Sequence, residues 1–322
     1  MPEHTLRHIL FSRSYNFLNM QGGFKLISIV RKKMMTKQER AALFFLLPSF
    51  IILSLFVFWP IVNSFILSFY NWSLLDSKHP FIGLDNYEAL IKDERFLNSV
   101  YNTIRYTVVT VPLSIIFALG LALLVNERLK GVSLFKAIYF LPVISSFAVI
   151  SIIWSFLMDP DIGLLVYYAN LAGFHTIGWL RSPVWAMPAV ILVAVWKNIG
   201  FNMVIYLAGL QAIPVSLYEA AALDGANKFR CFWHVTLQML RHTTLFVIII
   251  TVISSFQVFD QVYVMTRGGP LFSTETIVYY IYHHGIELLD MGYASAASWL
   301  LFLVIFAITL IQLRVFKYSR TD

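Results

Sequence analysis

The chain has 322 residues, of which 59% are hydrophobic and 13% are charged, and its mean hydropathy is +0.73. A soluble domain is nearer half apolar and a quarter charged, so this composition excludes a soluble enzyme or DNA-binding protein. The single cysteine, Cys231, excludes an internal disulfide and a cysteine-based zinc or iron–sulfur site. The composition therefore indicates a membrane protein, and the net charge of +7 raises the question of topology.

The first segment, 1–40, is basic and is expected to lie in the cytoplasm. It is not a signal peptide, because no apolar core with a small-residue cleavage site follows its charges. Met34 and Met35 stand directly before the sequence Thr-Lys-Gln-Glu-Arg. We hypothesise that synthesis starts there, which would make 1–33 a gene-model extension.

Six membrane spans are predicted, since a bilayer core about 30 Å thick needs about 20 apolar residues of helix, and five of them each centre on one uncharged run. The fourth span is the least obvious. The run 182–196 is short, and the run 198–218 carries several polar residues, so we predict one span with Lys197 near its middle. The predicted spans are 41–70, 102–125, 137–157, 184–207, 242–260 and 292–313.

The distribution of charge sets the topology. With the N-terminus inside, the inner segments hold 17 Lys and Arg against 6 Asp and Glu, and the outer segments hold 5 against 11. Seven spans would place the basic tail 314–322 outside, against the usual excess of positive charge in the cytoplasm. The sequence therefore predicts an all-α integral membrane protein with six transmembrane helices and both termini cytoplasmic.

The cytoplasmic loop 211–241 is the most informative part of the chain. Pro214 suits the first turn of a helix, and the residues from Glu219 to Leu223 are mostly strong helix formers. Asp224 and Gly225 predict a turn, after which a second short helix over 228–236 is expected. This helix–turn–helix on the inner membrane face is either a docking element for another protein or an ordinary surface hairpin of helices.

Part of this loop resembles the EAA loop of ABC importer permeases. The match is Glu-Ala-Ala at 219–221, then a glycine, and then Val-Thr-Leu at 235–237. The family usually has proline where this chain has Gln238. In that family the loop binds in a cleft of a cytoplasmic ATPase. The resemblance implies the coupling residues Glu219, Ala220, Ala221, Asp224 and Gly225.

Further stretches are similar to the carbohydrate-uptake branch of these permeases, and the resemblance covers about 40–318. They are Ala-Gly-Leu-Gln-Ala-Ile-Pro at 208–214, the outer loop from Phe259 to Thr276, Tyr-Tyr-Ile-Tyr at 279–282 and Met-Gly-Tyr-Ala-Ser-Ala at 291–296. They look like the first subunit of the two-permease importers for oligosaccharides or glycerol phosphate. In the outer loop, Arg267 stands where a third glycine is more usual.

The resemblance implies the fold of a type I ABC importer permease, with a permease domain over 98–313. It implies four kinds of partner: a second homologous permease subunit, two cytoplasmic ATPase subunits, an extracytoplasmic solute-binding protein and a sugar or related solute. No nucleic acid is expected. The chain has no P-loop, so we expect it to bind no cofactor, and ATP and Mg to be used by the partner ATPase.

Polar residues at membrane depth are candidates for the solute pathway, because ionisable groups there are costly and usually face a cavity or a partner. Lys197 has Asn198 beside it and Asn202 about one turn further on, whereas Gln257 and Trp299 are weaker candidates, as is Asp260. The alternative for each is a packing role, with Lys197 extending toward the interface.

Two outer features have a structural and a functional interpretation. Gly268, Gly269 and Pro270 form a turn, and they are candidates for docking the binding protein. His283 and His284 are adjacent, so on a helix they point in different directions, and we predict a structural role and no metal site. An acidic segment around Asp85 and Glu88 is expected to form an amphipathic surface helix.

The sequence thus predicts a permease subunit of an ATP-driven, binding-protein-dependent importer in the cytoplasmic membrane of a prokaryote. Its solute is a sugar or related organic molecule. Oligosaccharides, monosaccharides, polyols and glycerol phosphate all stay open. A stand-alone channel or ion-coupled carrier is the alternative, and an integral membrane enzyme is a third interpretation that lacks a convergent set of catalytic side chains.

Overall fold

The computed structural model describes residues 37–126, 132–173 and 178–318. Apart from two isolated β-bridges, the regular elements in these ranges are helices, with π-helical turns marked η. They are α1 (Lys37–Leu53), η1 (Ser54–Phe58), α2 (Trp59–Leu67), α3 (Asp85–Lys92), α4 (Glu94–Asn126), α5 (Val132–Ile144), α6 (Phe147–Leu157), α7 (Leu164–Leu171), α8 (Ala186–Gln211), α9 (Val215–Leu223), α10 (Lys228–Cys231), η2 (Phe232–Thr236), α11 (Leu237–Met239), α12 (Arg241–Phe256), α13 (Asp260–Met265), α14 (Ile277–Tyr282), η3 (His283–Glu287) and α15 (Met291–Tyr318).

The chain divides into two units, Met1–Phe56 and Val57–Asp322, which we describe separately. In the first unit, α1 is strongly apolar, and every described side chain from 41 to 53 is exposed. An apolar helix that is exposed on all sides is the pattern of a membrane-spanning helix. The predicted basic segment lies outside the described residues over 1–36.

The number of helices able to cross a membrane agrees with the sequence. Among the described residues, four helices are long and apolar enough, and two further pairs of helices qualify if each bent pair is one span. The fourth predicted span, 184–207, corresponds to the single helix α8, which begins two residues later and ends four residues later, and Lys197 lies near the middle of that helix.

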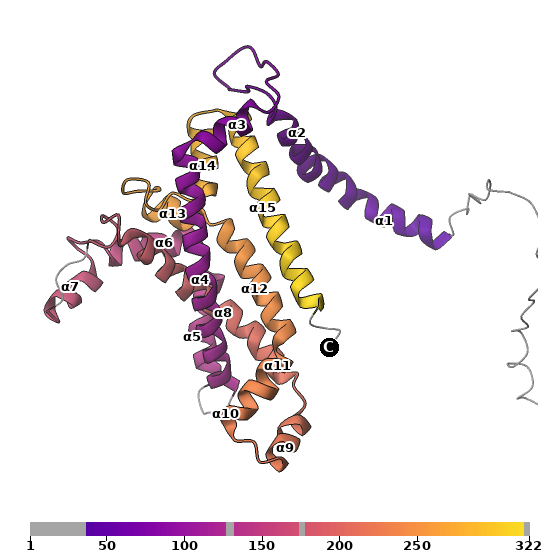
Figure 1. Cartoon of the computed structure of the whole chain (residues 1–322), viewed down its shortest axis with the longest axis vertical. Coiled ribbons are helices and arrows are strands. Elements are labelled where there is room, and N and C mark those ends of the chain that lie inside the picture. Colours follow the sequence, from indigo (N-terminus) through magenta and orange to yellow (C-terminus); the bar gives the residue numbers. More distant parts are fainter. Residues whose placement is uncertain (1–36, 127–131, 174–177, 319–322) are drawn as a thin grey trace, which may run out of the picture. The chain divides into compact units, whose positions relative to one another are not determined.

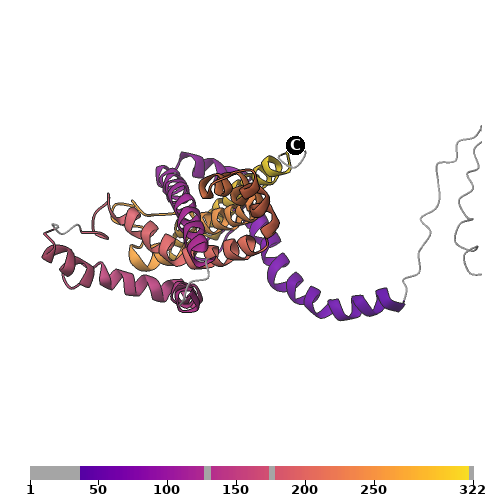
Figure 2. The same cartoon turned by 90° about the horizontal axis from the view of Figure 1, so that it is seen from below.

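The third predicted span, 137–157, is not the continuous helix that we expected. It is divided between α5 and α6, which are bent by 101°. The break lies at Ser146, whose backbone leaves the helical range, with φ −59° and ψ 140°. Figure 2 shows α5 nearly end-on and α6 and α7 extending away from it. The length and apolar content of the sequence do not reveal such a bend, because both halves are apolar.

In the second unit α4 packs along α8, and α5 and α12 pack against the same two helices (Figure 1). Small residues allow this: Ala118 and Ala122 of α4 are completely buried beside Met203 and Tyr206 of α8. At Gly200 the backbone of α5 comes so close that a Cβ atom would lie 2.0 Å from the carbonyl oxygen of Tyr139.

Functional regions gather at the two ends of this unit (Figure 1). α9 and α10 lie at one end, which we call the cytoplasmic end on the basis of the charge distribution. α3 and α14 lie at the other, the outer end. The acidic segment there forms the expected amphipathic helix α3, whose Leu90 is completely buried and whose Glu88 pairs with Lys92 on the exposed side.

Replacing Gly200 tests the contact between α5 and α8. We expect Gly200→Ala to lower stability by about 1–3 kcal/mol, because the added methyl group forces the helices apart. The control is Gly120→Ala on α4, where a Cβ meets no atom within 4 Å. Thermal unfolding of both variants in nanodiscs measures the difference, and equal midpoints would contradict the close contact.

Candidate functional site

The loop 214–239 forms the predicted helix–turn–helix at the cytoplasmic end, which we call the coupling knuckle. Pro214 caps α9, and Gly225 follows α9 with φ +76°, a conformation that favours glycine. The N–H of Ala226 donates to the carbonyl of Ala221 at 2.9 Å, closing the turn. Asn227 then caps α10 by accepting from the N–H of Arg230.

The knuckle exposes apolar side chains at its tip. Leu223, directly before the turn, is 90% exposed, and Phe229 and Trp233 on the second helix are also exposed. Exposed apolar groups at a loop tip commonly mark a protein interface. The five predicted coupling residues, Glu219, Ala220, Ala221, Asp224 and Gly225, surround Leu223 along the chain.

The two arms of the knuckle are joined to each other. The hydroxyl groups of Tyr218 on α9 and Thr236 on η2 share a hydrogen bond of 3.0 Å. Gln238, where the family usually has proline, lies in α11, so the helix continues to Met239 before a bend of 64° leads into α12. The knuckle therefore connects directly to the end of α8 and the start of α12.

Several of the predicted pathway residues line one polar hollow of about 300 Å³. Asn198 comes from α8, Gln257 from the end of α12, and Asp260 from the start of α13. Tyr106 and Gln261, which share a hydrogen bond, complete the polar lining. Amide and hydroxyl groups in one hollow can donate to and accept from a hydroxyl-rich solute.

Lys197 and Asn202 lie beside this hollow. The Lys197 side chain is almost fully buried, and its ammonium lies 4.2 Å from the ring centroid of Phe147, which lines the hollow. Asn202 donates to the hydroxyl of Thr251 at 3.3 Å and lines a smaller hollow of about 60 Å³, which Asn198 also lines. Four of the five predicted pathway residues are therefore neighbours.

The fifth predicted residue, Trp299, lies elsewhere. It packs edge to face against Phe65 and Phe302, with ring centroids 4.8 and 5.2 Å away, and lines a different, apolar hollow beside α2. Its surroundings are those of a packing residue, so Trp299 is not brought together with Lys197.

At the outer end, the loop 266–276 has an unusual backbone. Gly268 has φ +77°, Gly269–Pro270 is a cis peptide bond, and Leu271 and Phe272 also have positive φ. The hydroxyl of Thr274 donates to the carbonyl of Gly269 at 2.8 Å. This loop therefore has a defined shape, with the side chain of Leu271 exposed at its tip.

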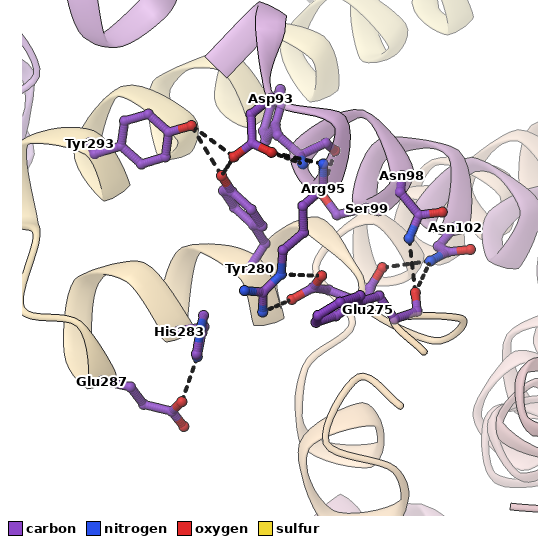
Figure 3. A network of polar contacts seen from close by, with 12 residues as sticks. Asp93, Arg95, Asn98, Ser99, Asn102, Glu275, Tyr280, His283, Glu287 and Tyr293 are labelled. Atoms are coloured by element: carbon purple, nitrogen blue, oxygen red, sulfur yellow. Dashed lines mark hydrogen bonds and ion pairs between the residues drawn. The ribbon is translucent and has the colours of Figure 1, made fainter. Parts of the chain in front are cut away.

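A polar network joins this loop to α4 (Figure 3). The guanidinium of Arg95 donates to both carboxylate oxygens of Glu275, at 2.9 and 2.7 Å. The amides of Asn98 and Asn102 each donate to the carbonyl of Phe272 at 2.9 Å. Glu275 is completely buried, so Arg95 neutralises a charge that would otherwise be very costly.

A second part of the network surrounds Asp93 between α3 and α4 (Figure 3). Tyr280 and Tyr293 donate to this carboxylate at 2.5 and 3.1 Å. Burial raises the pKa of Asp93, but the hydrogen bonds from Tyr280, from two backbone N–H groups and from Tyr293 outweigh burial and hold the pKa below its usual value. This stabilisation is lost when the pH falls through that lowered pKa.

The two adjacent histidines differ in environment. His283 pairs with Glu287 at 2.6 Å, whereas the ring of His284 packs against that of Tyr280, tilted by 35°, with ring centroids 4.3 Å apart. Burial and the neighbouring His283 and Arg95 lower the pKa of His284 to about 4. Within the described ranges, no group of three or more His, Cys, Asp or Glu residues has the arrangement of a metal site.

Sequence reasoning missed the partners of Glu275. Arg95, Asn98, Asn102 and Tyr106 recur at intervals of three and four residues, which places them on one face of α4. This polar stripe was visible in the sequence. The loop that it binds is about 170 residues away, and no local pattern predicts that pairing.

Breaking the buried ion pair tests the network. We expect Glu275→Gln to destabilise the protein by about 3 kcal/mol, because it leaves the Arg95 guanidinium without its carboxylate. The matched control is Glu88→Gln, which removes an exposed partner of Lys92 and should leave the unfolding midpoint unchanged. Thermal unfolding in nanodiscs measures both, and equal midpoints would show that the pair does not hold the loop.

Comparison with known proteins agrees with this geometry. Residues 89–319 match the family described as binding-protein-dependent transport system inner membrane component. The sulfoquinovosyl glycerol transport system permease protein SmoG of Agrobacterium fabrum is 35% identical over 86% of this chain and 90% of its own length. The trehalose/maltose transport system permease protein MalF of Thermococcus litoralis is 32% identical, over 89% and 97%.

A third relative, the sn-glycerol-3-phosphate transport system permease protein UgpA of Brucella abortus, is 34% identical over 84% of this chain and 92% of its own length. A solved bacterial ABC transporter that imports the acidic polysaccharide alginate has the same fold, with a TM-score of 0.77 and 24% identity over 87% of this chain and 96% of its own. The predicted type I permease fold is therefore confirmed. The chain belongs to the family of binding-protein-dependent transport system inner membrane components, as a multi-pass permease subunit of the ABC importer type.

Proposed function

We propose that this permease subunit imports a sugar or related polyhydroxylated solute, using energy from ATPase subunits that bind the coupling knuckle. The observation that carries the proposal is the exposed apolar tip of the knuckle, which follows directly from α8 and leads directly into α12. The relatives are named for sulfoquinovosyl glycerol, trehalose and maltose, and glycerol 3-phosphate, which all carry several hydroxyl groups.

In this proposal Leu223 inserts into a cleft of a cytoplasmic ATPase. Glu219 and Asp224 flank it with negative charge, and Ala220, Ala221 and Gly225 are small enough for close contact. When the ATPase closes, the hydrogen bond between Tyr218 and Thr236 makes both arms of the knuckle move together. This movement reaches the polar hollow through α8 and α12, and reorients it between the two sides of the membrane.

The solute would contact Asn198 and Gln257, whose amides offer both donors and acceptors, and Lys197 would add a positive charge at the wall of the hollow. Asn202 supports this wall through Thr251. These roles suit neutral sugars and also solutes with an acidic group. Trp299 is left out of the pathway because it lies in a separate apolar hollow.

Other subunits complete the proposed importer. A second homologous permease would close the open side of the polar hollow. Two ATPase subunits would bind ATP and Mg. This chain would hold no cofactor and would catalyse no covalent chemistry. A solute-binding protein would dock at the outer end, where Gly268, Gly269 and Pro270 shape the loop that exposes Leu271.

A charge at the tip of the knuckle tests the coupling. We expect Leu223→Asp to abolish co-purification with the ATPase and ATP-dependent uptake in proteoliposomes, because a carboxylate cannot enter an apolar cleft without a partner. The control is Leu75→Asp on the predicted outer side, since Leu75 is 75% exposed and should tolerate the change. Uptake that persists without the ATPase and collapses with the ion gradient would favour an ion-coupled carrier instead.

Removing the buried ammonium tests the pathway. We expect Lys197→Ala to lower uptake at least tenfold while association with the ATPase is unchanged, because the change affects the hollow and leaves the knuckle intact. The matched control is Trp299→Phe, which should leave uptake at the wild-type level. Normal uptake by Lys197→Ala at normal expression would remove this residue from the pathway.

A further inference from the structure

An apolar groove of about 560 Å³ lies between α4 and α8, separate from the polar hollow. Leu113 and Phe117 of α4 line one wall, and Pro188, Trp196 and Ile199 of α8 line the other. All of its lining residues are apolar except Arg105, whose guanidinium group belongs to the α4 wall. The proposed function uses neither the groove nor this charge.

Arg105 is placed at the boundary of the apolar part of α4. The residues from 106 to 126 carry no Asp, Glu, Lys or Arg, whereas charged residues precede Arg105 in this helix. Among the described residues, no carboxylate lies within 4.0 Å of its guanidinium group. Arg105 is partly buried, so the groove carries at its end a positive charge that an anion at the headgroup level can neutralise.

The length of the groove matches one leaflet of a bilayer. From Arg105 to Phe117 is twelve residues of helix, or about 18 Å. From Pro188 to Ile199 is eleven residues, or about 16 Å. Half of a hydrocarbon core about 30 Å thick is about 15 Å. Since α4 begins at the outer end, the groove extends from the outer boundary of the membrane toward its middle, with Arg105 at the headgroup level.

We propose that this groove binds an anionic phospholipid of the outer leaflet. One acyl chain lies along Leu113, Phe117 and Trp196, and the phosphate accepts hydrogen bonds from the guanidinium of Arg105. Arginine suits this role because its planar group can donate two parallel hydrogen bonds to one phosphate. The lipid would thereby cover the seam between α4 and α8.

A transmembrane helix of the second permease is the other occupant to consider. Such a helix would pack over the groove and insert its side chains into it. It would also have to bring a carboxylate to the level of Arg105. The narrow groove with one terminal cation fits a lipid chain with an anionic headgroup better.

The test uses the assembled importer, delipidated in detergent and supplied with either phosphatidylglycerol or phosphatidylcholine. Native mass spectrometry counts the bound lipid, and titration gives its affinity. We expect phosphatidylglycerol to bind preferentially to the wild type and about tenfold more weakly to Arg105→Gln, because one charge-assisted hydrogen bond is worth about a factor of ten. Arg105→Lys should have an intermediate affinity, because it keeps the charge but loses the two parallel hydrogen bonds. Lys136→Gln, at the cytoplasmic end, is the matched control and should bind normally.

Two further measurements separate the alternatives. Leu113→Trp fills the groove and should abolish binding of both lipids, and inorganic phosphate alone should produce no thermal stabilisation. Equal affinity of the wild type and Arg105→Gln for phosphatidylglycerol would overturn the proposal. So would a cysteine at position 113 that forms a disulfide with a cysteine on the second permease subunit, because that result would place protein in the groove.

Discussion

The outer half of the permease depends on the ion pair between Arg95 and Glu275. A polar group in or beside a membrane has little water to bind, so it must find its partners within the protein. The stripe on α4 satisfies this requirement by holding the backbone carbonyls of the loop 266–276 as well as its one carboxylate. The loop can therefore keep its left-handed turns while exposing Leu271, and α14 begins in a fixed position.

Two helices join the proposed solute hollow to the knuckle along the chain. Asn198 lies on α8, which ends three residues before the knuckle, and Ser254 lies on α12, which begins just after it. Both helices contribute side chains to the buried cluster that contains Met203, Tyr206 and Leu240. Closely packed side chains move together as one rigid body. In the proposed mechanism, a displacement at the cytoplasmic end therefore reaches the hollow without passing through the outer network.

The sequence predicts well those features that are local or set by the membrane. The knuckle follows from a proline, a run of helix formers and an Asp-Gly turn, and the number of spans follows from apolar length and charge asymmetry. The sequence did not predict the surroundings of Trp299. Its helix is apolar on nearly all sides, so the sequence does not show which side of the helix faces the pathway. The bend after α5 was also missed, because an unbroken apolar run does not mark it. The pairing of Arg95 with Glu275 was missed because it joins segments 180 residues apart.

The bend at Ser146 separates the third span into two halves that have different contacts. Its first half packs on α8 at Gly200, whereas its second half packs on α13 through Ile150. Each half therefore has a different neighbour, and Ser146 between them is not helical. A straight helix would pass every tilt of the cytoplasmic side on to the outer side. A bent span with separate neighbours allows the cytoplasmic and outer sides to move independently, which a transporter needs if it must never be open at both ends.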